Sequence, residues 1–145
     1  MKDIEGNLWG IIYVSAASQK FSFEEMADVK NEIKSDCLQK NISGLIVYAE
    51  GNVLCYIEGP KDAVTLQYNQ VLRDVRHKNL VKLFDHSIPY RYFEEFGLAF
   101  KFKDKVFKEL DDFKTEGHTA YIEECLNMND IVMKCISQFV QNNNN

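Results

Sequence analysis

The chain has 145 residues, a hydrophobic content of 46% and a formal net charge of −5 at pH 7. This size and composition predict one globular domain with a substantial core, and the acidic balance argues against nucleic-acid binding, which normally uses a basic surface. The sequence shows no signal-peptide pattern and no apolar run of about 20 residues, so we expect neither export nor a membrane helix. The four cysteines include no CxxC pair, so we expect free thiols in a reducing cytoplasm and no metal site.

The first third of the chain predicts a strand followed by a helix. Residues 8–15 form a nearly continuous apolar run, typical of a central strand buried on both faces. Ser22 and Glu25 have the spacing of a capping box, which predicts a helix from there to about residue 38. Apolar residues at steps of three and four form one stripe along this helix: Met26, Val29, Ile33 and Cys37.

The middle of the chain predicts a β-hairpin, a second helix and two more strands. Strands at about 43–49 and 53–58 are joined through Gly51, which tolerates the positive φ of a tight turn. Pro60 suits the first turn of a helix that we expect to run to about Arg76. Its expected apolar face is Val64, Tyr68, Val71, Leu72 and Val75. With strands at about 80–87 and 96–102, the order is β-α-β-β-α-β-β, an α/β fold with a ferredoxin-like sheet and two helices on one face.

The remaining residues predict a C-terminal helical extension, residues 104–145, that follows a domain of residues 1–103. Residues 105–113 suit a short helix or a turn, and helices are expected at about 118–126 and 130–141. We expect this extension to pack on the open face of the sheet or to form a dimer contact. The terminal asparagines, residues 142–145, are expected to be disordered.

Five short segments, taken in order along the chain, resemble the BLUF family of small flavin-binding blue-light sensors. They are Tyr13-Val14-Ser15, Ile42-Ser43-Gly44-Leu45, Tyr56-Ile57-Glu58-Gly59-Pro60, Asp74-Val75-Arg76-His77 and Phe93-Glu94-Glu95-Phe96-Gly97-Leu98. No single segment is specific, but their order on the expected elements, across residues 7–102, supports the family's fold. The resemblance implies a noncovalently bound flavin, usually FAD, and signalling through a protein partner or through self-association.

The resemblance also assigns site residues, and two of them depart from the family pattern. Tyr13 corresponds to the tyrosine that donates an electron and a proton to the excited flavin. Cys55 stands where the family has the switching glutamine, and Cys37 stands at the position of an asparagine that binds the flavin. A thiol is a weak donor and a weak acceptor. Flavin binding is therefore expected to weaken by roughly two to four powers of ten, with the glutamine-switch photocycle absent or altered.

The other flavin contacts implied by the resemblance come from the second helix, the first helix and the last strand. Val29 and Val71 are expected to sandwich the flavin ring. Gln70 falls where an arginine is frequent, and Phe96 and Leu98 fall where tryptophan and methionine are usual. The slot is thus expected to keep its shape while its polar lining changes.

Three functions remain open at this point. The first is a flavin-binding sensor, the second a flavin-free module for protein interactions, and the third a thiol redox sensor that uses Cys37 and Cys55. In a simpler interpretation, both cysteines are small buried hydrophobes and Tyr13 is an ordinary aromatic of the sheet. His77, His86 and His118 stand alone and are expected at the surface or at caps. An enzyme is the least favoured class, since no catalytic triad, phosphate loop or dinucleotide motif is present.

Overall fold

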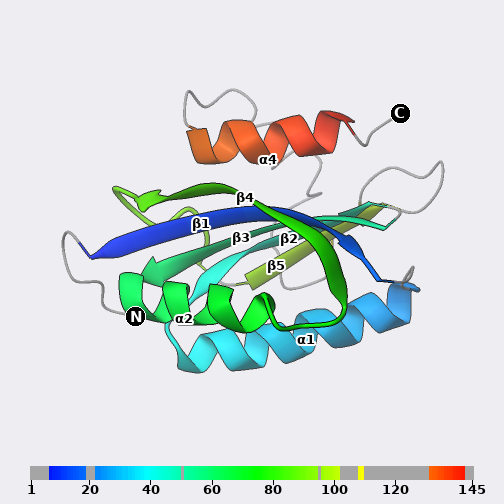
Figure 1. Ribbon diagram of the computed structural model, residues 1–145, viewed down its shortest axis with the longest axis horizontal. Coiled ribbons are helices and arrows are strands. Elements are labelled where there is room, and N and C mark those ends of the chain that lie inside the picture. The colour runs from blue at the N-terminus through cyan, green and yellow to red at the C-terminus, as the bar shows by residue number, and fades with distance from the viewer. Residues whose placement is uncertain are drawn as a thin grey trace.

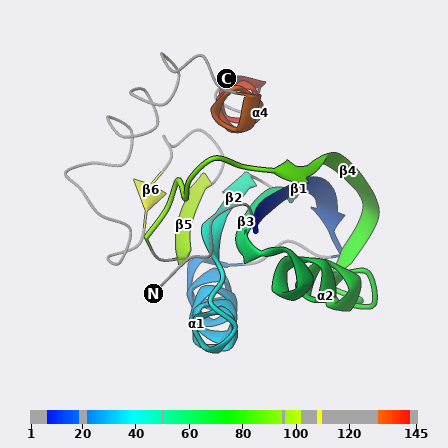
Figure 2. The ribbon, with the colours of Figure 1, turned by 90° about the vertical axis from the view of Figure 1, so that its left-hand side faces the viewer.

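The computed structural model describes residues 7–18, 22–49, 51–94, 96–101, 108–109 and 131–142. The strands of this part of the chain are β1 (Leu8–Ala17), β2 (Ser43–Ala49), β3 (Asn52–Pro60), β4 (His77–Ser87), β5 (Phe96–Lys101) and β6 (Lys108–Glu109). Its helices are α1 (Phe23–Gln39), α2 (Lys61–Val71) and α4 (Ile131–Asn142). The sheet has the order β4-β1-β3-β2-β5-β6, with α1 and α2 on one face and α4 on the other (Figures 1 and 2).

The pairing within the sheet confirms the predicted ferredoxin-like α/β fold. β3 runs antiparallel to both β1 and β2, β4 runs antiparallel to β1, and β5 runs parallel to β2. The expectation of a helix or turn near residues 105–113 is wrong for the two residues described there. Lys108 and Glu109 pair with Phe100 and Ala99, because β5 leaves an edge that a further strand can extend.

The capping box at the start of α1 is confirmed. The Glu25 backbone N–H donates to Ser22 Oγ at 3.1 Å, and the Ser22 backbone N–H donates to Glu25 Oε1 at 2.9 Å. Both contacts satisfy backbone donors that would have no partner at the first turn of a helix. The predicted stripe then places Met26 and Cys37 in the core under the helix.

The second helix ends five residues earlier than expected. α2 stops at Val71, and Leu72 and Val75 are 54% and 85% exposed, so their predicted place on the apolar face is wrong. The cause lies in Asp74, whose carboxylate accepts the Arg76 backbone N–H at 2.9 Å and stabilises a turn that leads into β4. The buried face of α2 consists of Val64, Gln67 and Tyr68.

The sheet carries a separate core layer on each face. Side chains of β1 and β3 alternate, so Tyr13 and Cys55 face α1 and α2, whereas Leu54 and Tyr56 face α4. α4 packs on the second layer through Val132, Ile136 and Val140. This packing matches one of the two arrangements expected for the C-terminal extension. The expected helix at 118–126, the boundary at 103/104 and residues 143–145 lie outside the described residues.

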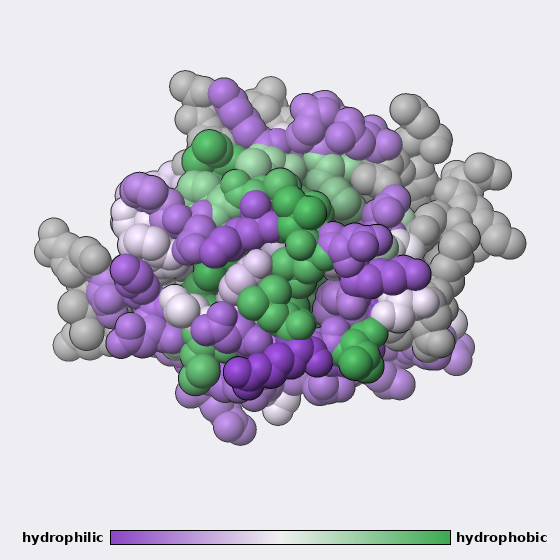
Figure 3. All heavy atoms as spheres, viewed as in Figure 1, coloured by the Kyte–Doolittle hydropathy of each residue, from purple (hydrophilic) through white to green (hydrophobic). Residues whose placement is uncertain are grey.

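A second pocket lies between α4 and the sheet. Figure 3 shows apolar side chains gathered in this band of the surface. Leu83 of β4 and Ile131 of α4, each about half exposed or more, line this pocket of about 340 Å³ together with Leu54 and Phe139. The α4 face is therefore only partly sealed against the sheet.

Candidate functional site

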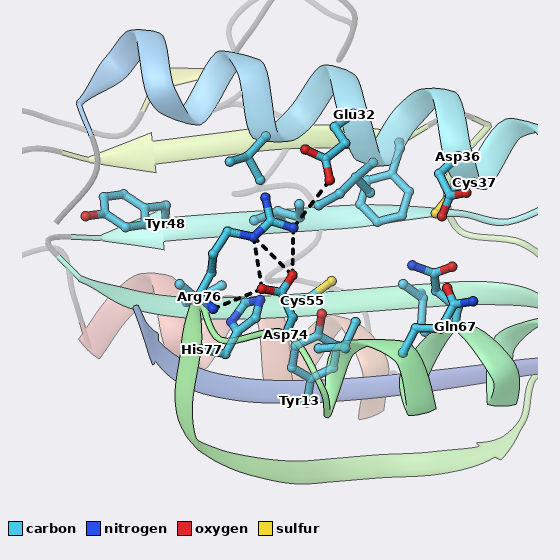
Figure 4. Close-up of a pocket in the computed structure, with 18 of the residues that line it drawn as sticks. Tyr13, Glu32, Asp36, Cys37, Tyr48, Cys55, Gln67, Asp74, Arg76 and His77 are labelled. Atoms are coloured by element: carbon cyan, nitrogen blue, oxygen red, sulfur yellow. Dashed lines mark hydrogen bonds and ion pairs between the residues drawn. The ribbon is translucent and has the colours of Figure 1, made fainter. Parts of the chain in front are cut away.

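The larger pocket, of about 420 Å³, opens between α1, α2 and the sheet (Figure 4). This volume is in the range of small-molecule and cofactor sites. α1 contributes an apolar wall through Met26, Val29 and Ile33, and α2 contributes Val71. The helices thus form the sides of the pocket, and the sheet forms its floor.

The structure brings six of the seven predicted site residues together in this pocket. They are Tyr13, Val29, Cys37, Cys55, Gln70 and Val71. The seventh, Leu98, belongs to β5 and pairs in register with Ile46 of β2, while the position of its side chain lies outside the described part of the chain. Phe96, two residues before Leu98, does line the pocket.

Tyr13 and Cys55 form a buried pair on the pocket floor. Antiparallel pairing of β1 with β3 places them opposite each other, and both side chains are almost fully buried. Burial raises the pKa of Tyr13 well above its ordinary value, with a further contribution from Cys55. Burial also raises the pKa of Cys55 to about 12, although its hydrogen bond with Tyr13 lowers it. Both groups therefore hold their protons at neutral pH.

Cys37 is a second buried thiol in the pocket. Burial raises its pKa to about 12, the charge of Asp36 adds to this effect, and the charge of Lys40 opposes it. Because the thiolate is the reactive form of cysteine, neither Cys37 nor Cys55 has the environment of a reactive thiol. Both are free in this structure.

One end of the pocket carries an ion-pair network that sequence reasoning did not assign. Arg76 Nη2 donates to Asp74 Oδ2 at 2.6 Å and Arg76 Nε donates to both Asp74 oxygens at 3.0 Å. Arg76 Nη2 also reaches Glu32 Oε1 of α1 at 3.4 Å, across the pocket from α1 to the turn that precedes β4 (Figure 4). The segment Asp74-Val75-Arg76-His77 is one of the five that resemble the family, but the sequence alone does not indicate that its side chains line the pocket.

His77 belongs to the same end of the pocket, so the expectation of a surface or capping role is wrong. It lines the pocket, it is half-buried, and its Nδ1 lies 2.8 Å from Ser15 Oγ. β1 and β4 are neighbours in the sheet, which brings these two residues together from 62 positions apart. Burial lowers the pKa of His77, and the negative charge of Asp74 acts in the opposite direction.

The other end of the pocket is polar but has a different composition. Asp36, Gln67 and Gln70 line it, and Lys40 stands behind them with its Nζ 3.0–3.1 Å from one oxygen of each. Figure 4 shows Gln67 at the same end as Asp36 and Cys37. Sequence reasoning missed Gln67 and Lys40; the spacing of Gln67 and Gln70, three residues apart on one helix face, was the available signal.

Two further properties concern only the described residues. None of their helices is long and apolar enough to cross a membrane. Within that same part of the chain, no group of three or more His, Cys, Asp or Glu side chains is placed to hold a metal ion.

These features define a small α/β ligand-binding domain with a cofactor-sized pocket between its two helices. The family model of BLUF, described as sensors of blue-light using FAD, matches residues 8–99. This match covers more than half of the sequence, and the chain therefore belongs to the BLUF family of flavin-binding photosensors.

Two relatives that match part of the chain agree with this assignment. The photoactivated adenylate cyclase subunit alpha of Euglena gracilis is 32% identical over 89 residues, which are 61% of this chain and 9% of that protein. The blue light- and temperature-regulated antirepressor BluF of Escherichia coli (strain K12) is 28% identical over 75 residues, which are 52% of this chain and 18% of that protein. The match thus spans less than a fifth of the length of either relative.

The fold is also shared with solved structures. The solved structure of the BlrP1 BLUF has a TM-score of 0.67 and 20% identity, covering 94% of this chain and 91% of that one. The photo-activated state of BlsA has a TM-score of 0.64 and 17% identity, covering 92% of this chain and 94% of that one. At these identities the likeness concerns the fold.

Proposed function

We propose that this BLUF chain is a flavin-binding sensory module whose pocket between α1 and α2 holds the flavin ring, with FAD as the cofactor. The observation that carries the proposal is the convergence of six of the predicted site residues on one pocket of about 420 Å³. Val29 and Val71, from the two flanking helices, supply flat aliphatic walls for a planar ring. Leu98 of β5 is proposed as a further contact near Phe96.

The floor of this pocket determines what the module can do with its cofactor. A bound flavin supplies absorption of blue light and an excited state that accepts electrons. Tyr13 is a buried, protonated phenol on that floor. Cys55 lies opposite Tyr13 and offers only one weak donor and one weak acceptor. Its thiol therefore cannot reverse hydrogen bonds as the primary amide of a glutamine does. We therefore propose that the usual glutamine-switch photocycle is absent or altered.

The test is the near-UV and visible absorption of purified protein, with and without added FAD, before and after blue light. We expect flavin bands that remain with the protein through gel filtration and no reversible red shift on illumination. A spectrum without flavin bands, unchanged by added FAD, would contradict flavin binding and favour the flavin-free interaction module. A reversible red shift of the wild-type protein would contradict the loss of the switch.

A double substitution tests the role of the two thiols directly. Cys37→Asn together with Cys55→Gln returns amides to the two positions, and we expect FAD affinity to rise by roughly a hundredfold or more. Cys135→Ser is the matched control, because Cys135 lies on α4 and lines the other pocket. Equal affinities of the double variant and the wild type would show that the thiols do not limit binding.

We also propose that the output is a contact with a cytoplasmic partner protein or with a second copy of the chain. Support comes from the relatives, whose names join a light response to an antirepressor in one case and to an adenylate cyclase in the other. In this proposal residues 1–103 sense and residues 104–145 extend the domain, with α4 against the sheet. The thiol redox alternative has less support, because burial raises the pKa of both pocket thiols to about 12.

A further inference from the structure

Lys40, just after the last turn of α1, binds three side-chain oxygens beside the pocket. Its Nζ lies 3.0 Å from Asp36 Oδ2, 3.0 Å from Gln67 Oε1 and 3.1 Å from Gln70 Oε1. An ammonium group has three donors and no acceptor. Both glutamines must therefore turn their oxygens towards Lys40 and their nitrogens away from it. Three donors meet three acceptors, so the orientation of both amides is determined.

The amide nitrogens that face away from Lys40 have no partner in the described part of the chain. Gln67 is only 8% exposed and lines the pocket, yet its one side-chain hydrogen bond there is the contact with Lys40. Gln67 lines the pocket, and its Nε2 is not fully enclosed by protein, so this N–H is accessible to a ligand. An acceptor oxygen of a ligand bound in the pocket would give this N–H a hydrogen-bond partner.

The ligand chemistry follows from the groups that line this end of the pocket. Gln67 and Gln70 offer amide donors, and Asp36, which binds Lys40 through Oδ2, offers Oδ1 as an acceptor. Two donors and one acceptor are the complement of a cyclic imide, which presents two carbonyl oxygens and one N–H. The pyrimidine edge of a flavin is such an imide. The weak thiol donor of Cys37 lies at this same end (Figure 4).

We propose that Lys40 holds Gln67 and Gln70 as a donor pair for the imide edge of the pocket's ligand, with Asp36 accepting the imide N–H. Lys40 is the positioning residue of this arrangement, and the glutamines make the contact. The inference rests on the proposed flavin-binding function. It also explains how a pocket that has two thiols in place of amides retains strong hydrogen-bond donors.

Riboflavin titration into the unliganded protein tests the donor pair. Gln67→Glu keeps an oxygen for Lys40 but removes the NH₂ group, and Lys40→Met removes the orienting cation. We expect each variant to bind riboflavin about three- to tenfold more weakly than the wild type. In the complex with Gln67→Glu, the carbonyl stretching bands of riboflavin should move to higher frequency, because a hydrogen bond to a carbonyl oxygen is lost. Lys78→Met, at an exposed position of β4, is the matched control and should bind within twofold of the wild type. Affinities and carbonyl bands equal to those of the wild type would overturn the proposal.

A ligand variant and a measurement without ligand complete the test. Riboflavin methylated at the imide nitrogen lacks the N–H for Asp36 and should bind at least tenfold more weakly; equal binding would overturn the imide assignment. In the unliganded protein, Lys40→Met should shift the side-chain amide NMR signals of Gln67 and Gln70. If the wild type binds no riboflavin, the proposed function fails, and unchanged amide signals would separately overturn the orienting role of Lys40.

Discussion

Glu58 is a fully buried carboxylate that joins β3 to the segment that precedes β5. Its Oε1 accepts the Tyr56 hydroxyl and the Tyr92 backbone N–H, and its Oε2 accepts the Ser43 hydroxyl and the Phe93 backbone N–H, all at 2.8 Å. Four donors thus converge on two oxygens. Glu58→Gln is a sharp perturbation, because it keeps the shape of the side chain and replaces one of these oxygens with a donor.

The cost of Glu58→Gln follows from this hydrogen-bond pattern. In either orientation the new NH₂ group faces one hydroxyl and one backbone N–H. The hydroxyl of Ser43 or Tyr56 can rotate and accept, but the backbone N–H of Phe93 or Tyr92 cannot, and it loses its hydrogen bond to the side chain at position 58. A hydrogen bond to a charged group contributes about 1.5–3 kcal/mol, and loss of the charge also weakens the remaining contacts. We expect a loss of about 2–4 kcal/mol in the free energy of unfolding.

Chemical denaturation followed by circular dichroism measures this loss. Glu24→Gln, an exposed change in the first turn of α1, is the control and should alter the free energy of unfolding by no more than about 0.5 kcal/mol. Hydrogen exchange at the amides of Tyr92 and Phe93 should accelerate only in Glu58→Gln. If both variants are equally stable, the carboxylate does not hold this segment and the argument fails.

The pH dependence of the same group gives an independent check. Burial raises the pKa of Glu58, while its four hydrogen bonds act in the opposite direction. Between the ordinary and the raised value, the native state holds more protons at this site than the unfolded state. The contribution of Glu58 to the free energy of unfolding should therefore fall as the pH rises through that window. Glu58→Gln, which does not titrate, should lack this decline.

Three further predictions concern other positions. Cys37 and Cys55 have pKa values of about 12, so only about one part in ten thousand of each thiol is thiolate at pH 8. Iodoacetamide should therefore label them only after the protein unfolds, which mass spectrometry measures. Rapid labelling of the native protein would contradict this prediction. The pKa of His77 is lowered in the native state, so the unfolded state binds a proton at this site at higher pH than the native state does. The free energy of unfolding should therefore fall as the pH drops below about 6.5, and it should fall less in His77→Gln. Equal acid sensitivity of the two proteins would contradict the lowered pKa of His77. Gly44→Ala would place its Cβ against the carbonyl oxygen of Tyr56 in the neighbouring strand, so we expect the variant not to fold; a native-like far-UV spectrum would refute this.

The sequence predicted the elements whose signals are local. The capping box of Ser22 and Glu25 and the turn at Gly51 depend on a few neighbouring residues, and both elements formed where expected. The end of α2 was predicted wrongly, because apolar periodicity continues to Val75 while the decisive interaction is the turn made by Asp74. Periodicity reports which face a residue would take in a helix, and it does not report where the helix stops.

The site was predictable where the family resemblance assigned a position and unpredictable where partners come from different elements. Tyr13 and Cys55 were expected at the pocket, and the register of β1 and β3 places them side by side. The contact of Lys40 with Gln67 joins residues 27 positions apart, and that of Arg76 with Glu32 joins residues 44 apart. Such pairs depend on how α1 and α2 lie on the sheet, which no local pattern in the sequence specifies.

The polar lining of the pocket differs from the lining that the family resemblance implies. The size of the pocket helps to decide whether this chain has lost its ligand or binds it through other contacts. Protein interiors pack closely, and a site without a ligand is most stable when larger side chains fill it. Cys37 and Cys55 have small side chains at positions where the resemblance implies amides, and a space of about 420 Å³ remains between α1 and α2. The polar groups around it are ordered by Lys40 at one end and by Arg76 at the other. An open pocket with oriented polar groups supports the proposal that this chain binds a ligand there.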